Sequence, residues 1–161
     1  MSDSVDVLRA HLTRVLDWEQ AHVGFDAAVA GLAHRERGMQ PSGFQHSPWQ
    51  LLEHMRIAQK DILDYCVDAH YVHKLTWPDD YWPTQPAPPD AQAWDESIAA
   101  FKADRQALKA LVADPQIDLF GLVPAGKEQH TYVRAMLLVT DHNAYHLGQL
   151  VAVRRALGAW A

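Results

Sequence analysis

Two histidines, His142 and His146, stand four residues apart in an apolar stretch near the end of the chain. Four residues of an α-helix advance about 400°, so both imidazoles point to the same side of a helix, one turn apart. At this spacing both rings can bind one metal ion. The chain has ten histidines, so such a pair also arises by chance. Its meaning depends on the helix that carries it and on a third ligand.

His54 is the best third ligand. It lies seven residues after Ser47, inside a segment with a clear helix start, and it borders an apolar stripe that can face the core. Three neutral imidazoles with water in the remaining position form an open, catalytic type of site. Zinc suits this ligand set best, and nickel, iron and manganese also accept imidazole. The alternative is a polar patch of hydrogen-bonded histidines in the core, and spacing alone leaves both interpretations open.

Other candidate ligands fit less well. His70 and His73 are also helix-spaced, but they fall near the predicted end of the same helix, where a cation interacts favourably with the helix dipole. His22 could support the ligands, serve as a fourth ligand or be partly exposed. Cys66 follows His54 by twelve residues, which is about 18 Å along a helix axis with a rotation of about 120°. We therefore exclude Cys66 from the same site.

No further catalytic residue is predicted. Glu53 and Asp141 are each rotated about 100° from the neighbouring histidine, so neither is an obvious general base. The sequence also lacks a nucleophile elbow, a phosphate-binding loop and a dinucleotide fingerprint. The predicted site thus consists of three metal ligands, with no cofactor other than the ion.

Four helical segments should position these histidines. They are expected at about residues 4–31, 48–73, 90–112 and 132–157, each with apolar residues at helical spacing. The best start is Ser47-Pro48-Trp49-Gln50, which combines an N-cap, a proline at the first helical position and a capping box. Five prolines between positions 78 and 89 exclude a helix there and indicate a long crossover. We predict an all-α, four-helix bundle with long crossover loops, as a single domain over residues 1–161.

The composition excludes several classes of protein. The chain has 161 residues, 48% hydrophobic and 21% charged, which is typical of a folded globular protein. A formal charge of −6 without a basic run argues against nucleic-acid binding. The single cysteine precludes an intrachain disulfide, and neither a signal peptide nor an apolar run of about 20 residues is present. We expect a cytoplasmic protein without nucleic-acid or membrane partners.

Three motifs carry a resemblance to a known family. They are SPWQLLEH at residues 47–54, WPDDYWP at residues 77–83 and HNAYHLGQ at residues 142–149. Together they resemble the DinB-like, YfiT-related family of four-helix bundles, over essentially the whole chain. The resemblance implies a divalent metal, often zinc or nickel, bound by His54, His142 and His146. It also implies a homodimer, as is frequent in that family.

The chemistry implied by the resemblance is broader. Characterised relatives include transferases and isomerases that use low-molecular-weight thiols such as bacillithiol or mycothiol, and metal-dependent hydrolases. We expect a metal-dependent enzyme acting on a small molecule. Thiol S-transfer ranks above hydrolysis because zinc, a borderline-soft ion, favours a soft thiolate ligand over hydroxide. The alternative to an enzyme is a non-catalytic bundle that binds a metal or small ligand, or serves in a stress response.

Overall fold

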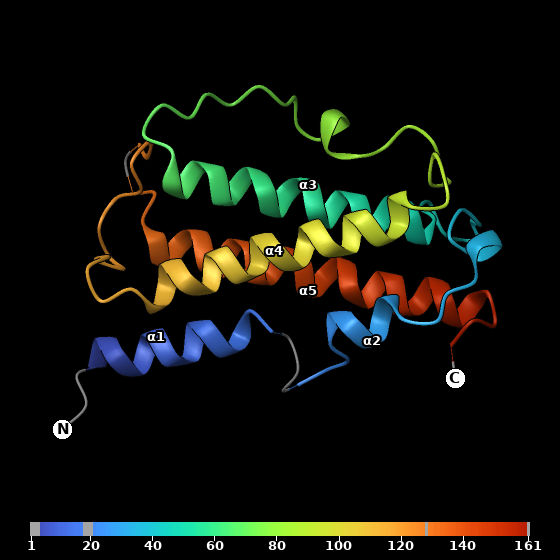
Figure 1. Ribbon diagram of the computed structural model, residues 1–161, viewed down its shortest axis with the longest axis horizontal. Helices are drawn as coiled ribbons and strands as arrows, with labels where there is room; N and C mark the ends of the chain where they lie inside the picture. The colour runs from blue at the N-terminus through green and yellow to red at the C-terminus, as the bar shows by residue number, and fades with distance from the viewer. Residues whose placement is uncertain (1–3, 18–20, 128, 161) are drawn as a thin grey trace.

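The chain folds mainly into helices, as the computed structural model shows (Figure 1). The structure describes residues 4–17, 21–127 and 129–160. Within these ranges the helices are α1 (Ser4–Val15), α2 (Phe25–Val29), α3 (Pro48–Val67), α4 (Ala93–Ala113) and α5 (Tyr132–Ala156), with two short 3-10 helices, η1 (His34–Glu36) and η2 (Asp79–Tyr81). The described ranges contain no β-strand, so the all-α prediction is confirmed. None of these helices is long and apolar enough to cross a membrane.

The two helices that carry the histidines begin where their N-caps predict. At the start of α3 the Ser47 hydroxyl accepts from the Gln50 amide, and the Gln50 side chain accepts from the Ser47 amide, both at 3.1 Å. At the start of α5 the Thr131 hydroxyl accepts from the backbone amide of Arg134 at 3.3 Å. Gly158, which has a left-handed φ of 68°, follows the end of α5. These local signals place the histidines in rigid helical turns.

The first predicted helix, over residues 4–31, is wrong as a continuous element. α1 ends at Val15, and α2 begins at Phe25 after Gly24, whose extended backbone forms the N-cap. Residues 18–20, within the predicted helix, lie outside the described residues. The apolar periodicity across this stretch therefore belongs to two helices rather than one.

The second predicted helix is shorter than expected. α3 ends at Val67 rather than near His73, because Asp68 adopts an extended backbone and its carboxylate accepts from the amide of His70 at 2.8 Å. This side-chain-to-backbone bond stabilises a turn in place of another helical turn. His70 and His73 lie beyond the helix, so their interpretation as cations in its last turn is wrong.

Helix directions follow from a long connection. Residues 68–92 run back along the length of α3, so α3 and α4 point the same way, whereas α5 runs opposite to both (Figure 1). α3 packs mainly against α4 and α5, α1 packs against α4, and α2 against α5. The connection is fastened to the start of α3, because Ser47 donates to the Pro86 carbonyl at 2.5 Å and Gln50 to the Pro83 carbonyl at 3.1 Å.

The core consists of two apolar clusters separated by a polar layer. One cluster joins α2 to the first half of α3 and the last half of α5, and includes Trp94 and Phe101 of α4. The other joins α1 to the last turns of α3 and α4 and the first turns of α5. Between them lie His54, Gln59 and Asn143, each no more than 2% exposed. Buried polar groups of this kind need hydrogen-bond partners, and these partners define the site.

Candidate metal centre

Three imidazoles from α3 and α5 converge on one point. The Nε2 atom of His54 lies 2.9 Å from Nε2 of His142 and 3.1 Å from Nε2 of His146. One ligand atom from each ring lies within 4.8 Å of the other two. Helical spacing aligns the two rings of α5, and the antiparallel packing of α3 places His54 opposite them. The structure thus brings together all three residues that the sequence singled out.

The outer nitrogens of His54 and His146 are held by acceptors. Nδ1 of His54 lies 2.9 Å from the backbone carbonyl of Tyr81, which can only accept. Nδ1 of His146 lies 2.8 Å from the side-chain oxygen of Gln149, one turn further along α5. Each Nδ1 therefore carries the ring proton, and each Nε2 presents a lone pair.

A chain of buried amides orients His142 in the same way. The carbonyl of Phe101 accepts from the Gln59 side-chain nitrogen at 2.8 Å, which turns the Gln59 oxygen towards Asn143. That oxygen accepts from the Asn143 nitrogen at 3.1 Å, and the Asn143 oxygen in turn lies 3.1 Å from Nδ1 of His142. Because the Phe101 carbonyl is only an acceptor, every group along this relay has one consistent direction. His142 consequently also carries its proton on Nδ1.

The Nε2 atoms of the three histidines are arranged to bind a cation rather than to hydrogen-bond with one another. The lone pairs on Nε2 of His142 and His146 both face Nε2 of His54, and no ring proton remains to place between them. Burial lowers the pKa of His54 to about 3 and that of His146 to about 4, and it also lowers the pKa of His142, so the rings are neutral at pH 7. Two nitrogens bonded to one zinc ion lie at most about 4.2 Å apart, and the observed 2.9 and 3.1 Å meet that condition. The donor set therefore fits a divalent transition metal.

Trp82 forms an aromatic wall beside this cluster. Its ring stacks on His54 with centroids 3.7 Å apart and an interplanar angle of 4°. His46 stacks on Trp82 as well, at 3.8 Å and 11°. Burial lowers the pKa of His46, and its Nδ1 is buried without a hydrogen-bond partner among the described residues. The stack fixes the plane of the His54 ring and places a fourth imidazole, that of His46, at the edge of the site.

A pocket of about 450 Å³ opens beside His146. Its lining includes His46, Trp82, Tyr145 and Gln149, and it extends along the last turns of α5. Tyr145 is 65% exposed, so this side of the cluster is open to solvent rather than sealed by core. A small molecule in the pocket would lie directly against one of the three converging rings.

Comparison with known protein families identifies the family of this chain. The model of the DinB superfamily matches residues 17–150, which is most of the chain. The chain belongs to the DinB superfamily. The searches of curated proteins and of solved structures returned no match. The family resemblance in the three motifs is therefore confirmed, while the match by itself assigns no reaction to this DinB superfamily member.

Four other candidate residues of this DinB superfamily protein lie outside the cluster. His22 is exposed, its ring lies 2.9 Å from the adjacent Val23 carbonyl, and it does not belong to the histidine group found among the described residues. Glu53 is bound by Arg56 and by the Ser97 hydroxyl. Cys66 and Asp141 were excluded as ligand and base, respectively, and neither belongs to the three-histidine group.

Sequence reasoning missed several supporting residues of the cluster. Gln149 stands three residues after His146, and Asn143 directly follows His142, so both were within the family motif but had no assigned role. Gln59 and His46 offered no signal, because their contacts depend on packing between distant segments. Trp82 lies in the motif at residues 77–83, and its position in the sequence does not indicate a contact with His54.

Proposed function

We propose that this protein is a divalent-metal-dependent enzyme that transfers a low-molecular-weight thiol to a small electrophilic substrate. His54, His142 and His146 hold the ion, and zinc is the preferred metal, ahead of nickel, iron and manganese. The supporting observation is the convergence of three Nε2 lone pairs, with every Nδ1 donating to an oxygen. The proposal includes the four-helix bundle expected from the sequence, formed by α1, α3, α4 and α5.

A bound divalent ion supplies Lewis-acid chemistry, which lowers the pKa of a thiol so that its anion is available as the nucleophile. The protein's own residues orient the ligands and exclude water. Tyr81, Gln149 and the Asn143 amide keep the three rings in one tautomer, and Trp82 shields one side of His54 from water. In the transfer the sulfur forms a bond to the electrophilic atom, the leaving group departs with the bonding electrons, and the thiol proton passes to solvent.

An enzymatic role is favoured over a structural metal because the cluster is open on one side. His146 lines the pocket of about 450 Å³, and so does the Gln149 side chain that orients it. A structural ion would instead be enclosed by protein ligands. Phe44, Trp82 and Tyr145 provide the pocket with aromatic surface that suits an organic substrate.

Thiol transfer is favoured over hydrolysis by the lining of the same pocket. Among the described residues that line it there is no Asp or Glu. Metal-dependent hydrolysis commonly uses a carboxylate as general base, and the buried carboxylate nearest in sequence, Glu53, is occupied by Arg56 and Ser97. A thiol coordinated to a divalent metal loses its proton without a protein base.

The proposal is tested with protein purified without a histidine tag. Elemental analysis should find about one divalent ion per chain, and His142→Ala or His146→Ala should abolish this binding, whereas the exposed His70→Ala should retain it. The cobalt-loaded protein is then titrated with glutathione, bacillithiol, mycothiol and 2-mercaptoethanol. A sulfur-to-metal charge-transfer band is expected with at least one of them.

Other outcomes would select a different function. Cobalt spectra that no thiol changes, together with hydrolysis of an ester or amide by the loaded protein, would establish the hydrolase alternative. An ion that accepts neither thiol nor substrate would indicate a non-catalytic metal-binding bundle. Stoichiometric metal retained by both histidine variants would contradict the metal centre itself.

A further inference from the structure

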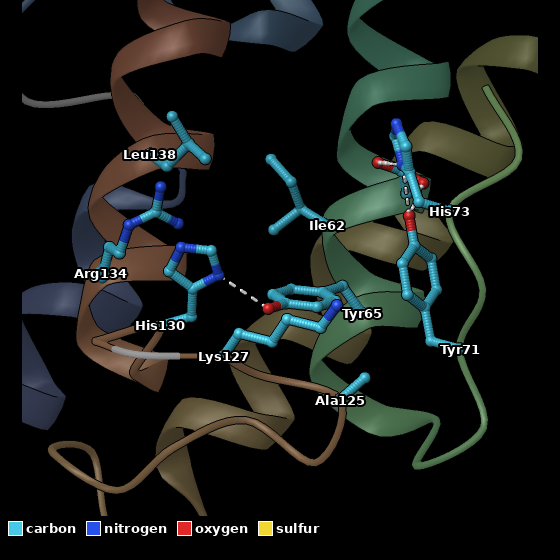
Figure 2. Close-up of a pocket in the computed structure, with 10 residues that line it drawn as sticks. Ile62, Tyr65, Tyr71, His73, Ala125, Lys127, His130, Arg134 and Leu138 are labelled. Atoms are coloured by element: carbon cyan, nitrogen blue, oxygen red, sulfur yellow. Dashed lines mark hydrogen bonds and ion pairs between the residues drawn. The ribbon is translucent and has the colours of Figure 1, made fainter. Parts of the chain in front are cut away.

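A second pocket, of about 420 Å³, lies between α3 and α5 on the side of the cluster away from the first pocket. Figure 2 shows its lining, which comes from α3, α5, the connection after α3 and the loop before α5. The two pockets have no lining residue in common, and none of the three converging histidines lines the second. A ligand here would bind separately from the metal.

One side of this pocket is cationic. Lys127, His130 and Arg134 lie together on that side, whereas Tyr71 and His73 face them from the other (Figure 2). These three residues fall within eight positions of a chain whose formal charge is −6. α5 also has no acidic residue in its first turn, so its own helix offers no partner for the Arg134 guanidinium.

The aromatic ring of Tyr65 lines the pocket beside the basic side chains. The Tyr65 hydroxyl lies 2.7 Å from Nδ1 of His130, and the Lys127 side chain extends towards the Tyr65 ring in Figure 2. When Tyr65 donates to Nδ1, the proton of the neutral His130 ring lies on Nε2 and is available to an acceptor. Lys127 and Arg134 add charged donors, which form the strongest hydrogen bonds with carboxylate and phosphate oxygens.

Apolar side chains continue from this basic end. Ile62 and Leu138 line the pocket, Leu138 on the same side as Arg134 (Figure 2), and Leu138 is 43% exposed. On the far side the Asp61 carboxylate accepts from the hydroxyls of Tyr71 and Tyr81, at 2.5 and 2.6 Å. Asp61 therefore disfavours an anion at that end, and the pocket distinguishes an acidic head from a neutral body.

We propose that this pocket binds a small organic acid. Its carboxylate or phosphate group is held by Lys127, His130 and Arg134, and its aromatic or apolar body packs on Tyr65, Ile62 and Leu138. The proposal does not rest on the proposed enzymatic function, because the residues that carry it lie apart from the three histidines. It gives the protein a second binding site, separate from the three histidines.

The test is isothermal titration calorimetry on the full-length, metal-free protein at low ionic strength and pH 7.5. Removing the metal prevents the probes from binding to it. The probes are phenyl phosphate and benzoate, which distinguish the two acid groups, and benzyl alcohol, which has the same body without the charge. Saturable binding of at least one acid is expected, with no binding of the alcohol and with an affinity that falls as salt is added.

Two pocket variants and one matched control localise the binding. Arg134→Gln and Lys127→Gln should each lower the affinity for the acid by about tenfold or more, because each removes a charge-assisted contact. Arg14→Gln removes the same charge from the exposed surface of α1 and should change the affinity less than twofold. Circular dichroism checks that each variant keeps its helical content.

Several results would overturn the proposal. These are the absence of binding by both acids up to about 10 mM, equal binding of benzyl alcohol, or affinities that neither pocket variant changes. An equal loss in Arg14→Gln would show that the overall charge, and not the pocket, attracts the acid. None of these results bears on metal content, so failure here is distinct from failure of the proposed enzyme.

Discussion

Gln59 and Asn143 join their side-chain amides across α3 and α5 through a hydrogen bond of 3.1 Å, and both residues are buried. The bond has a direction, because Gln59 donates onward to the Phe101 carbonyl. The Asn143 oxygen is thereby left to face His142. An apolar contact at the same place would pack the helices equally well, but it would not determine which nitrogen of His142 carries the proton.

The first prediction removes this relay. Gln59→Leu leaves the Asn143 amide without its acceptor, so it can turn its nitrogen towards Nδ1 of His142 and disturb the ring's tautomer. We expect zinc affinity to fall about 10- to 100-fold and the free energy of unfolding to fall by about 1–3 kcal/mol. Competition with a chromophoric chelator and urea unfolding measure the two effects. The exposed Gln106→Leu on α4 is the control, and equal affinities in the two variants would refute the relay.

The second prediction separates the two roles of Tyr81. Its hydroxyl donates to Asp61 at 2.6 Å, whereas its backbone carbonyl holds His54. Tyr81→Phe should cost about 1.5–3 kcal/mol of unfolding free energy, the usual range for a hydrogen bond to a charged group. Zinc stoichiometry should remain unchanged because the carbonyl is retained. Tyr145→Phe, at a position 65% exposed, should be neutral in the same unfolding assay. Loss of stoichiometric zinc in Tyr81→Phe would show that the two roles are not separable.

The third prediction concerns pH and the metal-free protein. Burial lowers the pKa of His54 to about 3 and of His146 to about 4, against about 6.5 in the unfolded chain. Below pH 6.5 the unfolded state binds more protons than the folded state, so stability falls as the pH falls, down to about pH 4 for His146 and pH 3 for His54. Each ring contributes up to about 1.4 kcal/mol per pH unit.

Urea unfolding at pH 7.5 and pH 5.0 measures this dependence. The variant His146→Leu lacks one of the buried imidazoles, so its stability should change less between the two pH values. Saturating zinc should raise stability at pH 7.5 and have a smaller effect at pH 5.0, because protons compete for the ligand nitrogens. Equal pH dependence in the wild type and the variant would contradict the assignment.

The fourth prediction compares two adjacent arginines. Arg154 is 6% exposed and donates to the carbonyls of Ala27, Ala28 and Ala159, whereas Arg155 is exposed. Arg154→Ala leaves these carbonyls without their donor and separates α2 from the end of α5, so we expect a loss of about 2–4 kcal/mol. Arg155→Ala should change stability by about 0.5 kcal/mol or less. A comparable loss in both variants would show that charge at the helix end, rather than the buried contacts, is responsible.

Local signals in the sequence were sufficient for the starts of α3 and α5 and for the three histidines of the cluster. Ser47 and Thr131 form N-caps through bonds that span three residues, so neighbouring residue types determine them. The spacing of His142 and His146 follows from helix geometry alone. His54 was found because the start of α3 is clear enough to count from. The convergence of the three rings then required only that α3 and α5 pack against each other.

Long-range contacts decided what the sequence could not show. The Gln59 relay, the stacking of His46 on Trp82 and the second pocket all join segments distant in the chain. The end of α3 was missed for a local reason. The Asp68 carboxylate accepts from the backbone amide of His70, and helical periodicity does not reveal such a bond. Helical spacing indicates which side chains share a face, but the proton positions on His54 and His142 and the second pocket depend on which face packs against which.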